Sequence, residues 1–302
     1  MPAGAQEAIA SPLGAPDAAE AMASAGNLEV RLARDAAELN EAQRLRYQVF
    51  YREMAARPSP EMAAAGRDFD RFDESCDCLL VYDRTRPAGR QVVGTYRLLR
   101  QEVAAAIGGF YSADEFDLAP LLARLSEGCR GLELGRSCVD AGYRNNATIQ
   151  LLWRGITRYL ALHRIGYMFG CASLPGTEPQ TLAAELGYLR HFHRAPPELR
   201  VRALEHRRAV VTLPAPEALS PRRALAALPP LIKGYLRLGA YVGEDAVVDR
   251  QFVTTDVFII LPVERLSQRY VSHFDRQGAI VKAPAVTRRP QRPAESVIGS
   301  KA

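Results

Sequence analysis

Charged side chains stand in four segments of this sequence at positions where a core pattern would not place them. Glu133 and Arg136 are three residues apart in LELGRSCV, and Arg97 lies late in QVVGTYRLL. Buried charges are costly unless they are paired, so charges on several segments are explained most economically by one polar cleft. Three earlier residues complete the set: Arg46, Asp70 and Asp73.

A carboxylate and a guanidinium in one strand suit acid–base chemistry at a cleft. Burial raises the pKa of a carboxylate, which would let Glu133 accept a proton near neutral pH. In regular strand geometry Glu133 and Arg136 point to opposite faces of the sheet unless a β-bulge shifts the register. One of them would then face the cleft while the other braces the structure. For any single residue of the set, an ion pair at the rim of a sheet is the simpler interpretation.

The elements that must position these residues follow from hydrophobic periodicity and capping signals. Strands are expected over 28–33, 78–83, 91–99, 132–139, 166–173, 208–213 and 253–261. Helices are expected over 35–54, 145–164, 179–188, 229–240 and 263–274, and 55–67 is expected to be a loop. Strands thus alternate with helices after an opening hairpin, which predicts a mixed α/β (α+β) protein with a central sheet.

The composition is ordinary for a globular protein, since 48 % of the 302 residues are apolar and 24 % are charged. Five cysteines without framework spacing favour reduced thiols and a cytoplasmic location, and no metal site is expected. The first 26 residues contain no Lys or Arg. Residues 1–26 are therefore expected to form a disordered leader rather than a secretory signal.

The net charge of +5 lies in the C-terminal tail, where six basic residues and one acid follow Asp275. The tail, 276–302, is expected to be disordered and solvated, with docking on an acidic partner or an anionic membrane as alternatives. No recognition motif for nucleic acid accompanies this charge, so nucleic acid is not an expected partner. Residues 27–275 are expected to form one domain with a C-terminal extension over about 215–275.

Four stretches resemble, in order, the N-acyltransferases that use acyl-carrier-protein thioesters: RYQVF, DFDRFDESCDCLLVYD, VVGTYRLL and ELGRSCVDAGYR. One branch of these enzymes is the acyl-homoserine-lactone synthases. The other is the ornithine–acyl-carrier-protein N-acyltransferases, which the chain resembles further, through RNNATIQLLWRGITRYL and the region from PPLIKGYLRLG onward. The resemblance covers roughly residues 28–275. It implies the GNAT fold, in which helices flank a mixed sheet and two parallel strands, here 132–139 and 166–173, splay apart around the thioester.

The resemblance implies transfer of a 3-hydroxyacyl group from acyl-carrier protein to the α-amino group of L-ornithine, giving lyso-ornithine lipid. It assigns catalytic duty to Glu133, Arg136, Asp70 and Asp73, with Glu133 as the base, directly or through water. Substrate binding is assigned to Arg46, Phe50 and Arg97, and the oxyanion to the backbone of Ser137, Cys138 and Val139. The two aspartates would hold the ammonium end of ornithine, and Arg46 or Arg97 its carboxylate.

The turn before the long helix matches a pantetheine phosphate better than coenzyme A. GNAT enzymes that use coenzyme A carry a glycine-rich loop there, whereas this chain has Arg144, Asn145, Asn146, Ala147 and Thr148. A single phosphate on the 4'-phosphopantetheine of acyl-carrier protein requires less of the loop. No cofactor is expected beyond that donor thioester, and its phosphate is assigned to Arg144, Asn145, Asn146 and Thr148.

Other readings stay open at this point. The chain could be a homoserine-lactone synthase that takes S-adenosylmethionine, an acyltransferase for lysine or glutamine, or a binding protein that kept the fold. Cys138 could act as a nucleophile, although direct transfer is simpler because no histidine lies near it in sequence. The helix at 229–240 has Lys233 and Arg237 on one side, which leaves open a peripheral contact with the inner face of the membrane.

Overall fold

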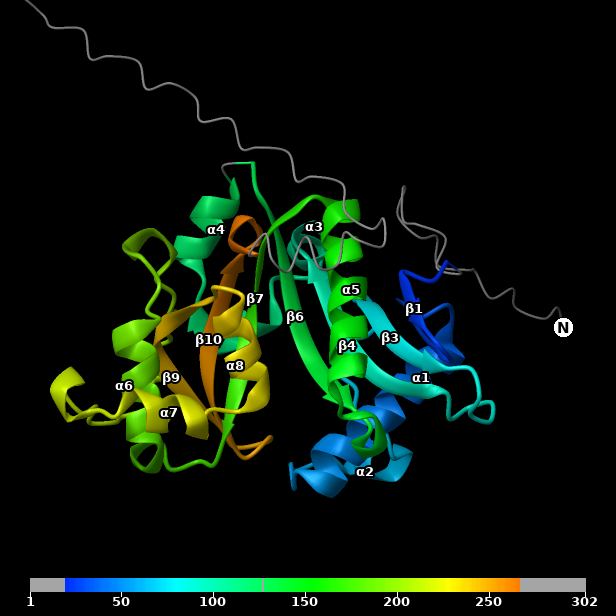
Figure 1. The fold of residues 1–302 in the computed structure, drawn as a ribbon, viewed down its shortest axis with the longest axis horizontal. Coiled ribbons are helices and arrows are strands. Elements are labelled where there is room, and N and C mark those ends of the chain that lie inside the picture. The colour runs from blue at the N-terminus through cyan, green and yellow to red at the C-terminus, as the bar shows by residue number, and fades with distance from the viewer. Residues whose placement is uncertain (1–19, 127, 267–302) are drawn as a thin grey trace, which may run out of the picture.

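The computed structural model describes residues 20–126 and 128–266, which are built around an eight-stranded sheet (Figure 1). The strand order is β1-β2-β3-β4-β6-β7-β10-β9, and every neighbouring pair is antiparallel except β6 and β7. The strands are β1 (Ala23–Ala25), β2 (Leu28–Leu32), β3 (Asp77–Asp83), β4 (Val92–Arg100), β6 (Arg130–Val139), β7 (Ile165–Pro175), β9 (Tyr241–Asp249) and β10 (Thr254–Pro262). A second, two-stranded sheet pairs β5 (Phe116–Asp117) with β8 (Arg202–Ala203). The predicted mixed sheet is confirmed.

Helices flank both faces of the large sheet. They are α1 (Ala36–Tyr47), α2 (Pro60–Ala65), α3 (Gln101–Ala106), α4 (Ala119–Ser126), α5 (Asn146–His163), α6 (Ala183–Phe192), α7 (Pro221–Ala227) and α8 (Pro230–Arg237). The expected capping box begins α1, where the Asp35 side chain accepts a hydrogen bond from the Glu38 N–H at 2.9 Å. No helix in the described part of the chain is long and apolar enough to span a membrane.

Side-chain alternation along the strands separates the two faces of the sheet. Leu98 packs in a core cluster with Ile156 of α5 and Tyr235 of α8, and Figure 1 shows these two helices on one face. Its neighbour Leu99 packs in another cluster with Leu121 of α4. We call these the α5 face and the α4 face, and parity assigns a strand residue of the site to one of them wherever no bulge intervenes.

The parallel strands β6 and β7 pair only at their beginnings. The register runs from Arg130 opposite Ile165 to Glu133 opposite Phe169, and beyond this point β6 pairs with β4 alone and β7 with β10 alone. At the separation Gly170 has φ +152°, and a Cβ there would lie 2.4 Å from the Leu134 carbonyl oxygen. The splayed parallel pair predicted from the resemblance is therefore present.

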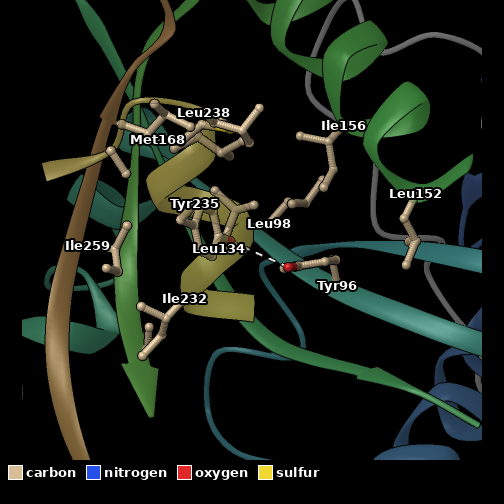
Figure 2. Packing of buried hydrophobic residues seen from close by; sticks show 14 of the residues in the cluster. Tyr96, Leu98, Leu134, Leu152, Ile156, Met168, Ile232, Tyr235, Leu238 and Ile259 are labelled. Carbon is tan, nitrogen blue, oxygen red and sulfur yellow. Dashed lines mark hydrogen bonds between the residues drawn. The ribbon is translucent and has the colours of Figure 1, made fainter. Parts of the chain in front are cut away.

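Helix α8 lies over this separation on the α5 face. Its Tyr235 side chain points towards Tyr96 of β4 beside Leu134 of β6 (Figure 2), and the two hydroxyl oxygens are 3.4 Å apart. Tyr235 and Ile232 are buried, so the apolar side of α8 packs against the domain core. Leu231, at 39 % exposure, lies towards solvent.

Two secondary-structure predictions are wrong within the described residues, and one long strand was not expected. The loop expected over 55–67 contains α2, which begins after Ser59 caps it and Pro60 sets its first turn. The strand expected over 208–213 forms only one bridge, Arg208 to Val247, and Val210 is 93 % exposed. Strand β9 was not expected, because Gly-Glu-Asp at its centre interrupts the apolar pattern of a strand. The sheet tolerates these charges there because β9 is an edge strand.

Two boundaries also differ from expectation. The helix expected over 35–54 continues after Tyr47 as a π-helix, η1 (Gln48–Glu53), a geometry often found at functional sites. The predicted leader, 1–26, must end earlier, because β1 pairs with β2 and Met22 and Ala23 are buried. Residues 1–19 and the whole tail, 276–302, lie outside the described residues. The closing helix expected over 263–274 has only the 3-10 turn η7 (Val263–Arg265) in the described part.

Candidate active site

A cavity of about 580 Å³ opens where β6 and β7 separate. Tyr96 and Tyr235 line it on the α5 face, while Arg97, Tyr111 and Glu133 line it from the α4 face. The cavity therefore passes through the sheet, with an aromatic wall on one face and a charged wall on the other. Phe50, carried by η1, also lines the cavity. Its ring packs edge-on against the Phe252 ring, with 5.6 Å between the two ring centroids.

Arg46 is fully buried in an ion-pair network. Its Nε donates to Asp68 at 2.7 Å, and its two terminal nitrogens donate to the Asp73 carboxylate at 2.7 and 2.9 Å. Asp68 also accepts from the Tyr51 hydroxyl at 2.8 Å. All three nitrogens of this guanidinium thus already donate to protein oxygens. The carboxylate-binding role expected for Arg46 does not fit this geometry, nor does a substrate contact by Asp73.

A second ion cluster connects the remaining members of the predicted set. Asp70 accepts from Arg97 at 2.6 Å and from Arg136 at 3.0 Å. Burial alone would raise the pKa of Asp70, but Arg97 and Arg136 outweigh it and lower the pKa below the usual range. Asp70 is therefore an anion neutralised by two arginines. It has little charge left for a substrate ammonium group.

A β-bulge brings Arg136 into the site. Gly135 pairs with Arg97 and Cys138 with Thr95, so Arg136 and Ser137 together lie opposite Tyr96. Arg136 takes the bulge conformation with φ +50°. Its guanidinium lies between two rings, 4.9 Å from the Tyr111 centroid and 4.7 Å from the Phe252 centroid. The bulge is the register shift that allows Glu133 and Arg136 to share one cavity.

Glu133 anchors the loop that carries Tyr111. Its Oε2 accepts from the Tyr111 N–H at 2.7 Å, and its Oε1 accepts from the Ser112 N–H at 2.8 Å and the Ser112 hydroxyl at 2.5 Å. Burial raises the pKa of Glu133, and the three hydrogen bonds counter part of that shift. The base role stays a prediction. The contacts add a positioning role, because the Tyr111 ring lies against both Arg97 and Arg136.

Glu133→Gln is expected to lower turnover by roughly 10- to 100-fold mainly through this loop. The amide nitrogen of Gln cannot accept, so one buried N–H loses its partner at a cost of about 1–3 kcal/mol. Urea unfolding should report that loss, and the pH profile of kcat should keep its wild-type shape. Ser112→Ala, which removes one of the three hydrogen bonds, is the matched control and should have a smaller effect. Loss of the acid limb of the profile in Glu133→Gln would instead assign the base to Glu133.

Of the four residues in the turn before α5 that were assigned to the donor phosphate, some are exposed and others are already engaged or buried. Thr148 is fully buried, and its N–H donates to the Asn145 side chain at 3.0 Å, which makes Asn145 the helix cap. Thr148 therefore cannot reach a phosphate, which corrects that assignment. Arg144 and Asn146 are exposed at the positive end of an 18-residue helix, and Arg144 also lines the cavity.

Cys138 lines the cavity but is 6 % exposed, and it packs with Leu80 and Val92 on the side of α1. Burial raises the pKa of this thiol, which opposes thiolate formation and a nucleophilic role. Ser137, within the bulge, and Val139, after it, also line the cavity. Whether their backbone N–H groups hold an oxyanion stays a prediction.

Two features of the site were missed by sequence reasoning. Asp68 was passed over within the acidic stretch RDFDRFDESCD, although it has the most central place in the Arg46 network. On the opposite wall, Cys171, Asp249 and Asp256 line the cavity, and the last two come from β9 and β10. An acid inside the apolar strand VTTDVFIIL is the same signal that drew attention to Glu133 and could have identified Asp256.

The chain is similar to known proteins of one family. Residues 45–154 match the family model described as an acetyltransferase (GNAT) domain. An L-ornithine N(alpha)-acyltransferase of Rhizobium meliloti is 47 % identical over 281 residues, which cover 92 % of this chain and 93 % of that protein. A protein of the same name from Brucella abortus is 50 % identical over 84 % of this chain and 90 % of its own length. The chain belongs to the L-ornithine N(alpha)-acyltransferase family. This membership confirms the resemblance and the predicted GNAT fold.

Solved structures related to this ornithine N(alpha)-acyltransferase family member are more distant. The crystal structure of the AHL synthase LasI is 14 % identical, with a TM-score of 0.41, and the match covers 80 % of this chain and 95 % of that one. The structure of FeeM, an N-acyl amino acid synthase from uncultured soil microbes, is 17 % identical with a TM-score of 0.35, over 53 % of this chain and 77 % of that one.

Proposed function

We propose that this chain transfers a 3-hydroxyacyl group from acyl-carrier protein to the α-amino group of L-ornithine. The observation that carries the proposal is membership of a family whose curated members, named L-ornithine N(alpha)-acyltransferase, align with it nearly end to end. The cavity at the β6–β7 separation supplies a place for the reaction. The product, lyso-ornithine lipid, would be the first intermediate of ornithine-lipid synthesis.

The donor arm is proposed to reach the cavity from the N-terminus of α5. The N–H groups of that helix end can bind one phosphate, as a pantetheine arm requires. Arg144 can add one terminal nitrogen, since its Nε donates to the Val139 carbonyl and its other terminal nitrogen to Glu53. The arm would then run under α8 along the apolar wall formed by Leu134, Tyr235 and Leu231. No cofactor beyond the arm is proposed.

Acyl transfer itself needs a neutral amine, a polarised carbonyl and a fixed arm. The amine nitrogen attacks the thioester carbon, the C–S bond breaks, and the thiolate takes up a proton as the amide loses one. Backbone N–H groups after the Arg136 bulge are proposed to stabilise the oxyanion. Because both oxygens of Glu133 already accept hydrogen bonds, we propose that Glu133 holds the Tyr111 loop and that the proton lost by the amine reaches the leaving thiolate through water.

The amphipathic product suggests where the enzyme works. We propose that it acts in the cytoplasm and contacts the anionic inner face of the membrane peripherally. Leu231 and Arg237 are exposed on α8, Leu231 lines the cavity, and exposed apolar and basic residues on one helix suit such a surface. Flotation of the purified chain with anionic vesicles, compared with neutral vesicles, would measure this contact.

The reaction is tested by incubating the full chain with labelled 3-hydroxyacyl-carrier protein and ornithine. Acylated ornithine is the expected product, and the same acyl group on coenzyme A should react at least about tenfold more slowly because the loop lacks a pyrophosphate site. Lysine and glutamine are tested as competing acceptors. Acyl-homoserine lactone formed from S-adenosylmethionine, or no transfer to any amine, would contradict the proposal.

A further inference from the structure

The wall of the cavity formed by β7, β9 and β10 carries acids that the transfer mechanism does not use. Asp256 is 6 % exposed, lines the cavity, and points to the α4 face because its neighbour Val257 belongs to the core of the α5 face. Asp249, at the end of β9, lines the same cavity. Glu115 lies behind them, with its carboxylate, that of Asp256 and the Cys171 thiol within 4.8 Å of one another.

Asp256 has no cationic partner among residues 20–126 and 128–266. Its Oδ1 accepts from the Thr254 hydroxyl at 2.8 Å, which does not neutralise a charge. Glu115 differs, because Arg207 pairs with it at 2.9 Å. Burial, with the nearby Glu115 charge, raises the pKa of Asp256 to about 7. A buried acid without a counter-ion is costly to the fold, which is typical of a group kept for a ligand.

The arginines on the opposite wall do not supply this charge. Arg97 and Arg136 are held by Asp70, and Arg136 also lies 3.3 Å from Asp68. The cavity therefore has a neutralised wall on β4 and β6 and an uncompensated acidic wall on β9 and β10. A ligand that fits both walls carries a cationic group at the acidic end.

The geometry points to Asp256 as the residue that binds the side-chain ammonium of the acceptor amino acid, with Asp249 beside it. Asp256 would thereby select acceptors with a basic side chain over neutral ones. This assignment rests on the proposed function. Asp256 would be the residue that distinguishes ornithine from an amino acid of the same chain length that lacks the second amine.

A metal ion fits this cluster less well than an ammonium group. The Glu115 carboxylate is already engaged by Arg207 and by the Cys171 thiol at 3.5 Å. Burial raises the pKa of the Cys171 thiol well above its ordinary value, so the thiolate that a metal would need is disfavoured. An ammonium group needs only carboxylate acceptors. Asp256 provides one, and Asp249, whose Oδ1 accepts from the Gln251 and Phe252 N–H groups, offers its second oxygen.

The test compares ornithine with norvaline, which has the same chain length but no side-chain amine. Wild-type enzyme should acylate ornithine with a kcat/KM about 100-fold above that for norvaline. Asp256→Asn should lower the ornithine value about 100-fold and change the norvaline value less than about threefold. Where norvaline turnover is too slow to follow, its inhibition constant against ornithine gives the same comparison. Asp245→Asn is the control, because Asp245 lies on the same hairpin but does not line this cavity.

The pH dependence separates this role from a general base. In the wild type the ornithine-to-norvaline ratio should rise as the pH increases through about 7, where Asp256 ionises. In Asp256→Asn the ratio should be flat. Equal losses on both substrates would mean that Asp256 acts on the α-amine that they share, and no loss on either would remove it from the site; each result overturns the inference.

Failure of the inference and failure of the proposed function give different results. Wild-type enzyme that acylates ornithine and norvaline equally keeps the function and rejects the role of Asp256. Wild-type enzyme that acylates neither rejects the function. Loss of folding cannot imitate the expected result, because Asp256→Asn removes an uncompensated buried charge and its Tm at pH 8 should not fall below that of the wild type.

Discussion

Replacing Arg46 with alanine is expected to lower the free energy of unfolding by about 3–5 kcal/mol. The substitution leaves Asp68 and Asp73 buried without the guanidinium that neutralises both. It also removes the link between α1 and the acidic loop that holds Asp70, so activity should fall with stability. Urea unfolding followed by circular dichroism measures the change, with an unchanged m value showing that the folded state is otherwise intact.

Two variants sharpen this prediction. Arg46→Lys keeps the charge but cannot form the two-sided fork to Asp68 and Asp73, so its loss should be intermediate. Arg158→Ala removes a side chain that is 41 % exposed and paired with Glu20 at 3.5 Å, and its cost should stay below about 1 kcal/mol. A stability for Arg46→Ala within 1 kcal/mol of the wild type would contradict the network described here.

A methyl group at Gly170 is expected to force β6 and β7 apart, with a cost of about 3 kcal/mol or more. The new Cβ would lie 2.4 Å from the Leu134 carbonyl oxygen, and neither strand backbone can move without breaking sheet pairing. The φ of +152° adds strain for any residue with a side chain. Gly170→Ala should therefore lower Tm by several degrees and abolish most acyl transfer.

Gly166→Ala on the same strand is the matched control. A Cβ at Gly166 meets its nearest atom, the Cys129 Cβ, at 3.5 Å, which is ordinary van der Waals contact. It should leave both Tm and activity close to the wild-type values. If the two variants behave alike, the close approach at Gly170 does not set the width of the cavity.

Much of the fold follows from the sequence because most elements carry local signals. The capping box before α1 and the apolar stripe of α5 predict these helices, and the continuous apolar run in β7 predicts a strand buried on both faces. Strand β9 could not be predicted this way, since an edge strand needs fewer apolar residues and its charges contact solvent-side arginines such as Arg190. The sequence QVFYRE likewise gives no local signal for the π-helix η1.

The site was partly predictable for a different reason. Charges at positions where a core pattern would not place them predicted that six residues share one region, and they do: Arg46, Asp70, Asp73, Arg97, Glu133 and Arg136. Their roles were not predictable, because a role depends on which partner already occupies each charge. Arg46 and Asp73 neutralise each other, so the substrate contacts assigned to them would require breaking a buried pair. The acids on β9 and β10 were missed because their proximity arises only when the hairpin folds back onto β7.

The passage of the cavity through the sheet has a consequence for how this family could diversify. In the proposed mechanism the acyl arm and the acceptor approach from opposite faces, with different elements behind each. A change of acceptor would need substitutions only on the β9–β10 hairpin, whereas a change of chain length would involve α8 and the residues beneath it. The two specificities can therefore evolve separately, with the bulge at Arg136 as the part that both must retain.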